Sequence, residues 1–144
     1  MKNITLIVLF CFYSLSNFAS PIDSTTRIDS TQNIVNDEIN NSIAAAIGAG
    51  DAKKLAFYFS ASIDLTLPNT DGTYSKSQAE MIIMKFFSQY PPDSFKLNQQ
   101  GSSNEGSQFA IGTYSSKSVR FRTYFLVKKV SGISQIQQLQ FEKE

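Results

Sequence analysis

Two arginines and a tyrosine are spaced two residues apart near the end of the chain. They are Arg120, Arg122 and Tyr124, and side chains at this spacing on a strand point to the same side. The apolar residues Val119, Phe121, Phe125 and Val127 occupy the other parity. Arginine and tyrosine are enriched at binding surfaces, and arginine pairs with carboxylate and phosphate groups. Two interpretations stay open: a solvated sheet face with ordinary cross-strand pairs, or a surface that binds an anion or a protein, mainly a second copy.

Histidine and tryptophan are absent from the 144 residues, and cysteine occurs once. Without histidine the chain cannot form a Ser-His-Asp or Cys-His nucleophile, or a zinc site that needs imidazole. The acidic residues are scattered without calcium-loop spacing, so we expect no metal and no cofactor. With 13 Lys and Arg against 12 Asp and Glu, the basic excess of a nucleic-acid-binding protein is also missing.

The first 19 residues have the pattern of a secretory signal peptide. A charged residue precedes an apolar run from Ile4 to Leu15, and small or polar residues follow up to Ala19. The run is shorter than the roughly 18 to 20 residues that span a bilayer as a helix, so we predict no transmembrane anchor. We expect cleavage after Ala19 and a periplasmic or extracellular location.

Residues 20–33 are rich in Ser, Thr and Asp and contain few apolar groups. Such a segment cannot bury enough apolar surface to offset its chain entropy, and it predicts a flexible polar leader. Residues 34–144 then form a single domain, long enough to build a core without disulfides.

Helical spacing dominates the first part of this domain. From Ile34 onward, apolar residues recur every four positions, at Val35, Ile39, Ile43 and Ile47, and predict a helix that ends at Gly48. Asp51 can cap a second, short helix that runs to about Phe59. Alternation over residues 63–67 predicts a strand, and residues 69–72 a turn. A capping box at Ser75 then begins a third helix, which Pro91 and Pro92 stop.

Beyond Asp93 the apolar period changes to two, which predicts four consecutive strands. Short connections rich in Ser and Gly separate them, as in an antiparallel meander. The residues assigned to the apolar side are Phe95, Leu97, Phe109, Ile111, Val119, Phe121, Phe125, Val127, Ile136, Leu139 and Phe141. This assignment places Tyr114 and Lys96 on the opposite side, with Arg120, Arg122 and Tyr124.

The last strand changes parity between Ile136 and Leu139. An extra residue in one strand has this effect, so we predict a β-bulge near Gln137 and Gln138. Helices that precede a run of antiparallel strands indicate an α+β fold, with the helices on the apolar face of the sheet.

The order of elements resembles the nuclear transport factor 2-like, or cystatin-like, α+β fold, a cone in which three N-terminal helices pack on a bent antiparallel sheet. Several segments resemble a domain-of-unknown-function family of exported Bacteroidetes proteins with that fold: residues 43–59, 74–80, 86–92, 101–112, 120–126 and 136–144. The resemblance covers residues 36–144. It implies the fold and export but brings no catalytic motif, because this fold hosts enzymes and binding modules alike.

Enzymes of this fold class place an aspartate base and tyrosine donors inside the cone, and the resemblance makes Asp64, Tyr58 and Tyr74 the weak catalytic candidates. A carboxylate in an apolar cavity can act as a base on carbon. However, Asp64 alternates with Ile63 and Leu65, and it faces water if those two face the core.

We therefore expect an exported, non-catalytic binding or interaction module. It self-associates or binds a protein partner through the outer sheet face, or it holds a small apolar ligand in the cone. The alternative is a small isomerase or lyase that uses an Asp and Tyr pair. We expect no nucleic acid as a partner.

Overall fold

The computed structural model describes residues 25–103 and 105–144, with side chains from residue 37 onward. The predicted signal peptide lies outside these residues. The described chain forms three helices and six strands in the order α1, α2, β1, β2, α3, β3, β4, β5, β6. Helices on one face of a single, mainly antiparallel sheet make this an α+β fold.

Two helices begin at side-chain caps. In α2 (Ala52–Phe57), the Asp51 carboxylate accepts a hydrogen bond from the backbone nitrogen of Lys54 at 2.9 Å. In α3 (Lys76–Gln89), Ser75 and Gln78 form the predicted capping box. Both caps satisfy backbone N–H groups that lack a partner within the helix.

Helix α1 (Thr25–Gly48) is longer than expected. Residues 25–33, predicted as part of a flexible leader, are helical in the structure. Neither glycine nor proline occurs between Thr25 and Ile47, so no strong helix breaker stops the helix upstream of Ile34. Gly48 ends it, and Gly50 turns the chain toward α2 with a φ of +65°.

The six strands form one sheet in the order β2-β1-β6-β5-β4-β3. The predicted strands are present as β1 (Phe59–Leu67), β3 (Ser94–Ser102), β4 (Gln108–Ser116), β5 (Val119–Val130) and β6 (Ile133–Lys143). Neighbouring strands are antiparallel except β1 and β6, which are parallel. That parallel pair joins the β1–β2 hairpin to the predicted meander.

The sheet contains the predicted bulge but differs from the prediction at the turn over residues 69–72. Leu126 pairs with Gln138 while Val127 pairs with Ile136, which confirms the predicted bulge at Gln137. Residues 69–72 are only partly a turn, because Thr70 begins a further strand, β2 (Thr70–Ser75). This strand has no alternating apolar residues, and its pairing with β1 comes from the hairpin.

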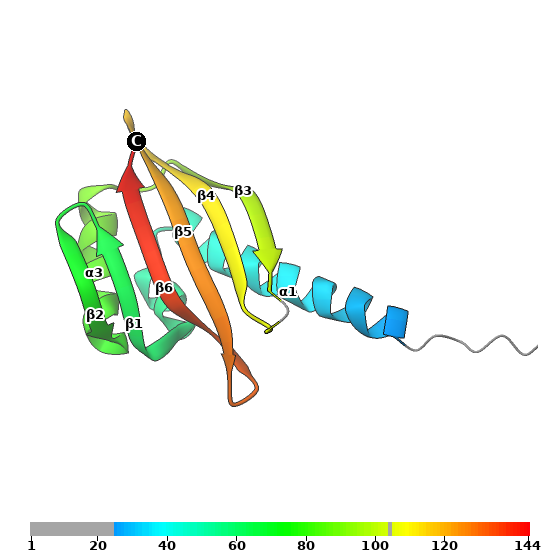
Figure 1. The fold of residues 1–144 in the computed structure, drawn as a ribbon. Helices are drawn as coiled ribbons and strands as arrows, with labels where there is room; N and C mark the ends of the chain where they lie inside the picture. The colour runs from blue at the N-terminus through cyan, green and yellow to red at the C-terminus, as the bar shows by residue number, and fades with distance from the viewer. Residues whose placement is uncertain (1–24, 104) are drawn as a thin grey trace, which may run out of the picture.

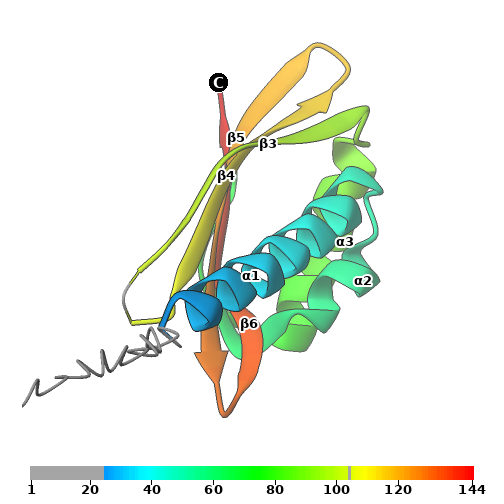
Figure 2. The ribbon, with the colours of Figure 1, turned by 90° about the vertical axis from the view of Figure 1, so that its right-hand side faces the viewer.

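All three helices lie on one side of the sheet, and the other side is uncovered (Figures 1 and 2). Helix α3 packs on β1 and β2, whereas α1 packs on β3 and β4. Helix α2 lies against α1 and α3. We call the helix-covered side of the sheet the inner face and the uncovered side the outer face.

Aromatic rings fill the space between α3 and the inner face. Phe86 lies at the centre, with ring centroids 4.7 Å from Phe141, 5.3 Å from Phe121 and 5.7 Å from Tyr114. The interplanar angles favour tilted and edge-on contacts, which aromatic quadrupoles prefer. This part of the cone is packed core.

Candidate functional site

The outer face carries the arginine and tyrosine side chains that the sequence singled out. In β5, Phe121, Thr123, Phe125 and Val127 are buried on the inner face, and Arg120, Arg122, Tyr124 and Leu126 alternate with them. The arginines are exposed, and Tyr124 and Leu126 are half-buried. The strand therefore places these side chains together, as its alternation predicts.

One cross-strand row of the outer face is rich in charge. Lys96 on β3 pairs with Thr113, Thr113 with Arg122, and Arg122 with Glu142. The Arg122 Nη1 and Glu142 Oε2 atoms are 3.8 Å apart. Because both side chains of this pair are about half exposed, it adds little to stability and leaves Arg122 accessible.

Next to this row, the part of the outer face on β4 and β5 is apolar, and the same rows continue into Gln138 and Gln140 on β6. Tyr124 lies beside Ile111, and Leu126 lies beside Phe109, on the neighbouring strand β4. A Cβ atom built on Gly101 would lie 2.7 Å from the Phe109 ring, so this ring rests directly on the glycine of β3. Four half-buried apolar or aromatic side chains thus form a band across β4 and β5.

The far side of the outer face is acidic. Asp64 on β1 accepts a hydrogen bond from the Thr73 hydroxyl at 2.6 Å, and Asp71 on β2 accepts one from the Thr66 hydroxyl at 2.9 Å. Both carboxylates are exposed. The basic residues lie on β3 and β5 and these two acids on β1 and β2, while a third acid, Glu142 on β6, lies beside Arg122.

The prediction that Tyr114 joins the outer face is wrong. Tyr114 is fully buried on the inner face, and its hydroxyl donates to the carbonyl oxygen of Tyr90. Burial raises the pKa of the Tyr114 phenol well above its ordinary value, and the Asp93 carboxylate raises it further.

The same correction applies to the rest of β4. The side predicted to face the helices faces outward, and the side predicted to face outward faces the helices. Gln108, Ala110 and Ser116 face inward with Tyr114, and Phe109 and Ile111 face outward. The assignment failed because the larger aliphatic and aromatic residues of this strand lie on the outer face. Its inner face combines one glutamine and several small residues with one tyrosine, whose ring packs against Phe86 and Phe87 of α3.

The three catalytic candidates are not brought together. Asp64 lies on the outer face, whereas Tyr74 pairs with the buried Ile63 and is oriented toward α3. Tyr58 follows α2 and lines a groove beside α1. The aspartate and both tyrosines therefore do not share a cavity.

Other site types receive no support from the described residues. In the described part of the chain, no three His, Cys, Asp or Glu side chains gather as a metal ion would require. Among the same residues, none of the helices is both long and apolar enough to cross a membrane.

The fold belongs to the nuclear transport factor 2-like class. A nuclear transport factor 2-like protein of unknown function from Shewanella baltica superimposes with a TM-score of 0.59 at 13% identity, covering 80% of this chain and 95% of that one. The match to the family model of the domain of unknown function DUF4783 spans residues 40–142, and the chain belongs to this family.

Crystal structures of two family members are similar to this chain. The Bacteroides uniformis protein is 28% identical, with a TM-score of 0.68 over 72% of this chain and 95% of its own. The Bacteroides ovatus protein is 26% identical, with a TM-score of 0.68 over 72% and 93% of the two chains. No curated protein matches the sequence.

Proposed function

We propose that this protein is an exported, non-catalytic interaction module that self-associates through the outer face. The observation that carries the proposal is the arrangement of that face: an apolar band on β4 and β5, basic residues on β3 and β5, and two acidic residues on β1 and β2, across the glutamines of β6. Such a face is complementary to itself. In a two-fold face-to-face pair, the Arg122 side of each copy meets the Asp64 side of the other.

The area of the face suits this role. Six strands spaced about 4.8 Å apart give a width of about 24 Å, and nine-residue strands extend it over about 30 Å. The product of about 700 Å² is close to the roughly 800 Å² that each partner contributes to a standard interface. Tyr124 and Leu126 lie toward its middle, where buried aromatic anchors contribute most to binding.

Reversing the charges of Arg122 and Asp64 tests whether the protein self-associates through the outer face. Arg122→Glu and Asp64→Lys each place like charges opposite one another in the pair, so we expect each variant alone to sediment as a monomer. A mixture of the two variants restores both opposite-charge contacts, and we expect it to dimerise. Lys85→Glu, on α3 behind the sheet, is the matched control and keeps the wild-type mass.

Analytical ultracentrifugation gives the masses. A wild-type protein that is monomeric throughout the micromolar range would contradict the proposal. So would a mixture of the two variants that stays monomeric while the wild type dimerises.

Export is supported by the charged start and short apolar run of residues 1–19. Expression of the full chain in a Gram-negative host, followed by mass spectrometry of the periplasmic and medium fractions, tests it. We expect a mature N-terminus near Ser20. An uncleaved chain in the cytoplasm would contradict export without affecting the self-association proposal.

A further inference from the structure

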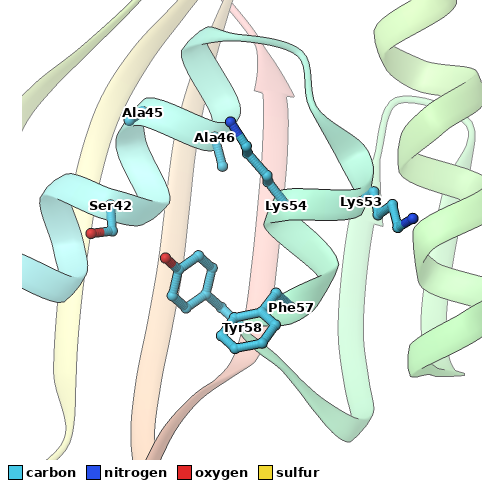
Figure 3. A pocket seen from close by; sticks show the side chains of 7 residues that line it. All are labelled: Ser42, Ala45, Ala46, Lys53, Lys54, Phe57 and Tyr58. Carbon is cyan, nitrogen blue, oxygen red and sulfur yellow. The ribbon is translucent and has the colours of Figure 1, made fainter.

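A groove lies between α1 and α2, on the helical side of the molecule and away from the outer face (Figure 3). Its volume is about 580 Å³, within the range of about 300 to 1,000 Å³ typical of small-molecule sites. The residues that line it are Ser42, Ala45, Ala46, Lys53, Lys54, Phe57 and Tyr58. This groove could not be predicted from the sequence, because its walls come from two helices whose packing only the fold determines.

The walls of the groove are apolar. Ala45 and Ala46 of α1 form one side, and the rings of Phe57 and Tyr58 form the other, edge to face with centroids 5.5 Å apart. The Phe57 side chain is 77% exposed, the largest value among the exposed hydrophobic residues of the described chain. An aliphatic chain lying in the groove would remove part of this ring from water, which favours binding.

The polar groups at the groove are hydrogen-bond donors suited to an anion. In Figure 3 the Lys54 side chain extends toward α1, and the Tyr58 hydroxyl points to the same helix near Ser42. The neighbouring Lys53 side chain extends away, toward α3. The two lysines therefore differ in direction although they are adjacent in the sequence.

The local contacts leave Lys54 available. Its ammonium nitrogen is 3.9 Å from Asp51 Oδ2, in a pair whose lysine side chain is 75% exposed. The other Asp51 oxygen caps α2. An ammonium group has three N–H donors, so Lys54 can keep this contact and still bind a second carboxylate.

We propose that the groove binds an amphiphile with an aliphatic tail and a carboxylate head. The head accepts hydrogen bonds from the Lys54 ammonium and the Tyr58 hydroxyl, and the tail lies between the two alanines and the Phe57 ring. The proposal is independent of self-association, because the groove is on the helical layer and the outer face is on the opposite side of the sheet.

Titration with dodecanoate below its micelle concentration tests the proposal, with calorimetry and NMR as readouts. We expect saturable binding of one dodecanoate per chain, with methyl shifts at Ala45 and Ala46. Dodecyltrimethylammonium has the same tail with a cationic head, and we expect no saturable binding of it. Absence of dodecanoate binding, or equal binding of the two compounds, would overturn the proposal.

The adjacent lysines provide a matched pair of variants. Lys54→Gln and Lys53→Gln remove the same charge from consecutive positions of α2. Loss of a charge-assisted hydrogen bond corresponds to about a tenfold increase in the dissociation constant, which we expect for Lys54→Gln. We expect less than a twofold change for Lys53→Gln, because the charged end of the Lys53 side chain extends away from the groove, toward α3. Equal effects of the two variants would show that dodecanoate is attracted to positive charge in general, and would overturn the proposed binding site.

A third variant tests the tail contacts without changing charge. Ala45 is exposed on α1, so Ala45→Trp fills the groove while leaving the core intact, as an unchanged melting temperature verifies. We expect it to abolish dodecanoate binding. If Ala45→Trp binds dodecanoate as the wild type does, the groove is not the site.

Discussion

The inner and outer faces of the sheet are made by the same six strands and have different chemistry. On the inner face, Phe121, Phe125 and Phe141 are fully buried under the helices. On the outer face, Tyr124 and Leu126 are half-buried and flanked by charges. Because side chains alternate along a strand, neighbouring residues belong to different faces. Stability therefore depends on the inner face, and the proposed self-association on the outer one.

Phe86→Ala is the strongest test of the inner face. Phe86 of α3 contacts three rings of the sheet, and its loss leaves a cavity among Tyr114, Phe121 and Phe141. We expect the free energy of unfolding to fall by about 3 to 5 kcal/mol, measured by urea denaturation. A loss below about 1 kcal/mol would mean that the aromatic cluster is not the main core.

A pair of glycine variants compares the faces directly. A Cβ atom at Gly112, on the inner face, would lie 2.7 Å from the backbone oxygen of Lys96 and 2.5 Å from the Phe95 ring. Backbone cannot give way easily, so we expect Gly112→Ala to cost about 1 to 3 kcal/mol.

Gly101, on the outer face, is the matched position. There a Cβ atom would meet only the end of the Phe109 ring among its closest neighbours, and a half-buried ring can move outward. We expect Gly101→Ala to cost less than about 1 kcal/mol. Thermal denaturation of both variants measures the difference, and equal costs would contradict the contrast between the faces.

Tyr114→Phe tests the buried hydroxyl of the inner face. The Tyr90 carbonyl loses its side-chain donor, which we expect to cost about 1 to 2 kcal/mol. The folded state raises the pKa of Tyr114, so the unfolded chain releases this proton first as the pH rises. This contribution to stability is complete below about pH 10, the ordinary tyrosine pKa, and falls above it.

The comparison of wild type and Tyr114→Phe isolates this group. We expect the stability difference between them to shrink as the pH rises above about 10, in denaturation curves collected at several pH values. A difference that is constant from pH 8 to 11 would exclude the Tyr114 phenol as the titrating group.

Arg122→Gln has the smallest expected effect on stability. Its ion pair with Glu142 is exposed, and we expect the free energy of unfolding to change by less than about 0.5 kcal/mol. Self-association should nevertheless weaken, as sedimentation measures. A large loss of stability would mean that Arg122 supports the fold rather than a partner.

Most elements could be predicted because their signals are local. The capping box at Ser75, the cap at Asp51 and the bulge near Gln137 all involve residues close together in the chain. In β5 the apolar residues Val119, Phe121, Phe125 and Val127 share one parity, so the faces of Arg122 and Tyr124 followed from the sequence.

Strand β4 could not be assigned in this way. Both of its faces carry apolar or aromatic residues, and alternation alone does not say which set faces the helices. The strand faces inward with Ala110 and Tyr114 because the rings of α3 need small neighbours and Tyr90 offers an acceptor. That preference comes from residues distant in the chain.

The position of Asp71 on the outer face was also not predictable from local alternation, because it depends on strand pairing. Residues 70–75 lack the alternation of a strand and become one only by pairing with β1, which places Asp71 beside Thr66. The groove between α1 and α2 likewise arises from how two helices pack.

The sequence by itself determined the order of the helices and most strands, their caps and the two sides of β5, because hydrophobic periodicity and capping act over a few residues. Only the tertiary structure decided which side of β4 is buried, that β1 lies beside β6, and where charges meet across strands. Those features depend on long-range packing against a shared core, in which each side chain is accommodated by partners that local spacing does not specify.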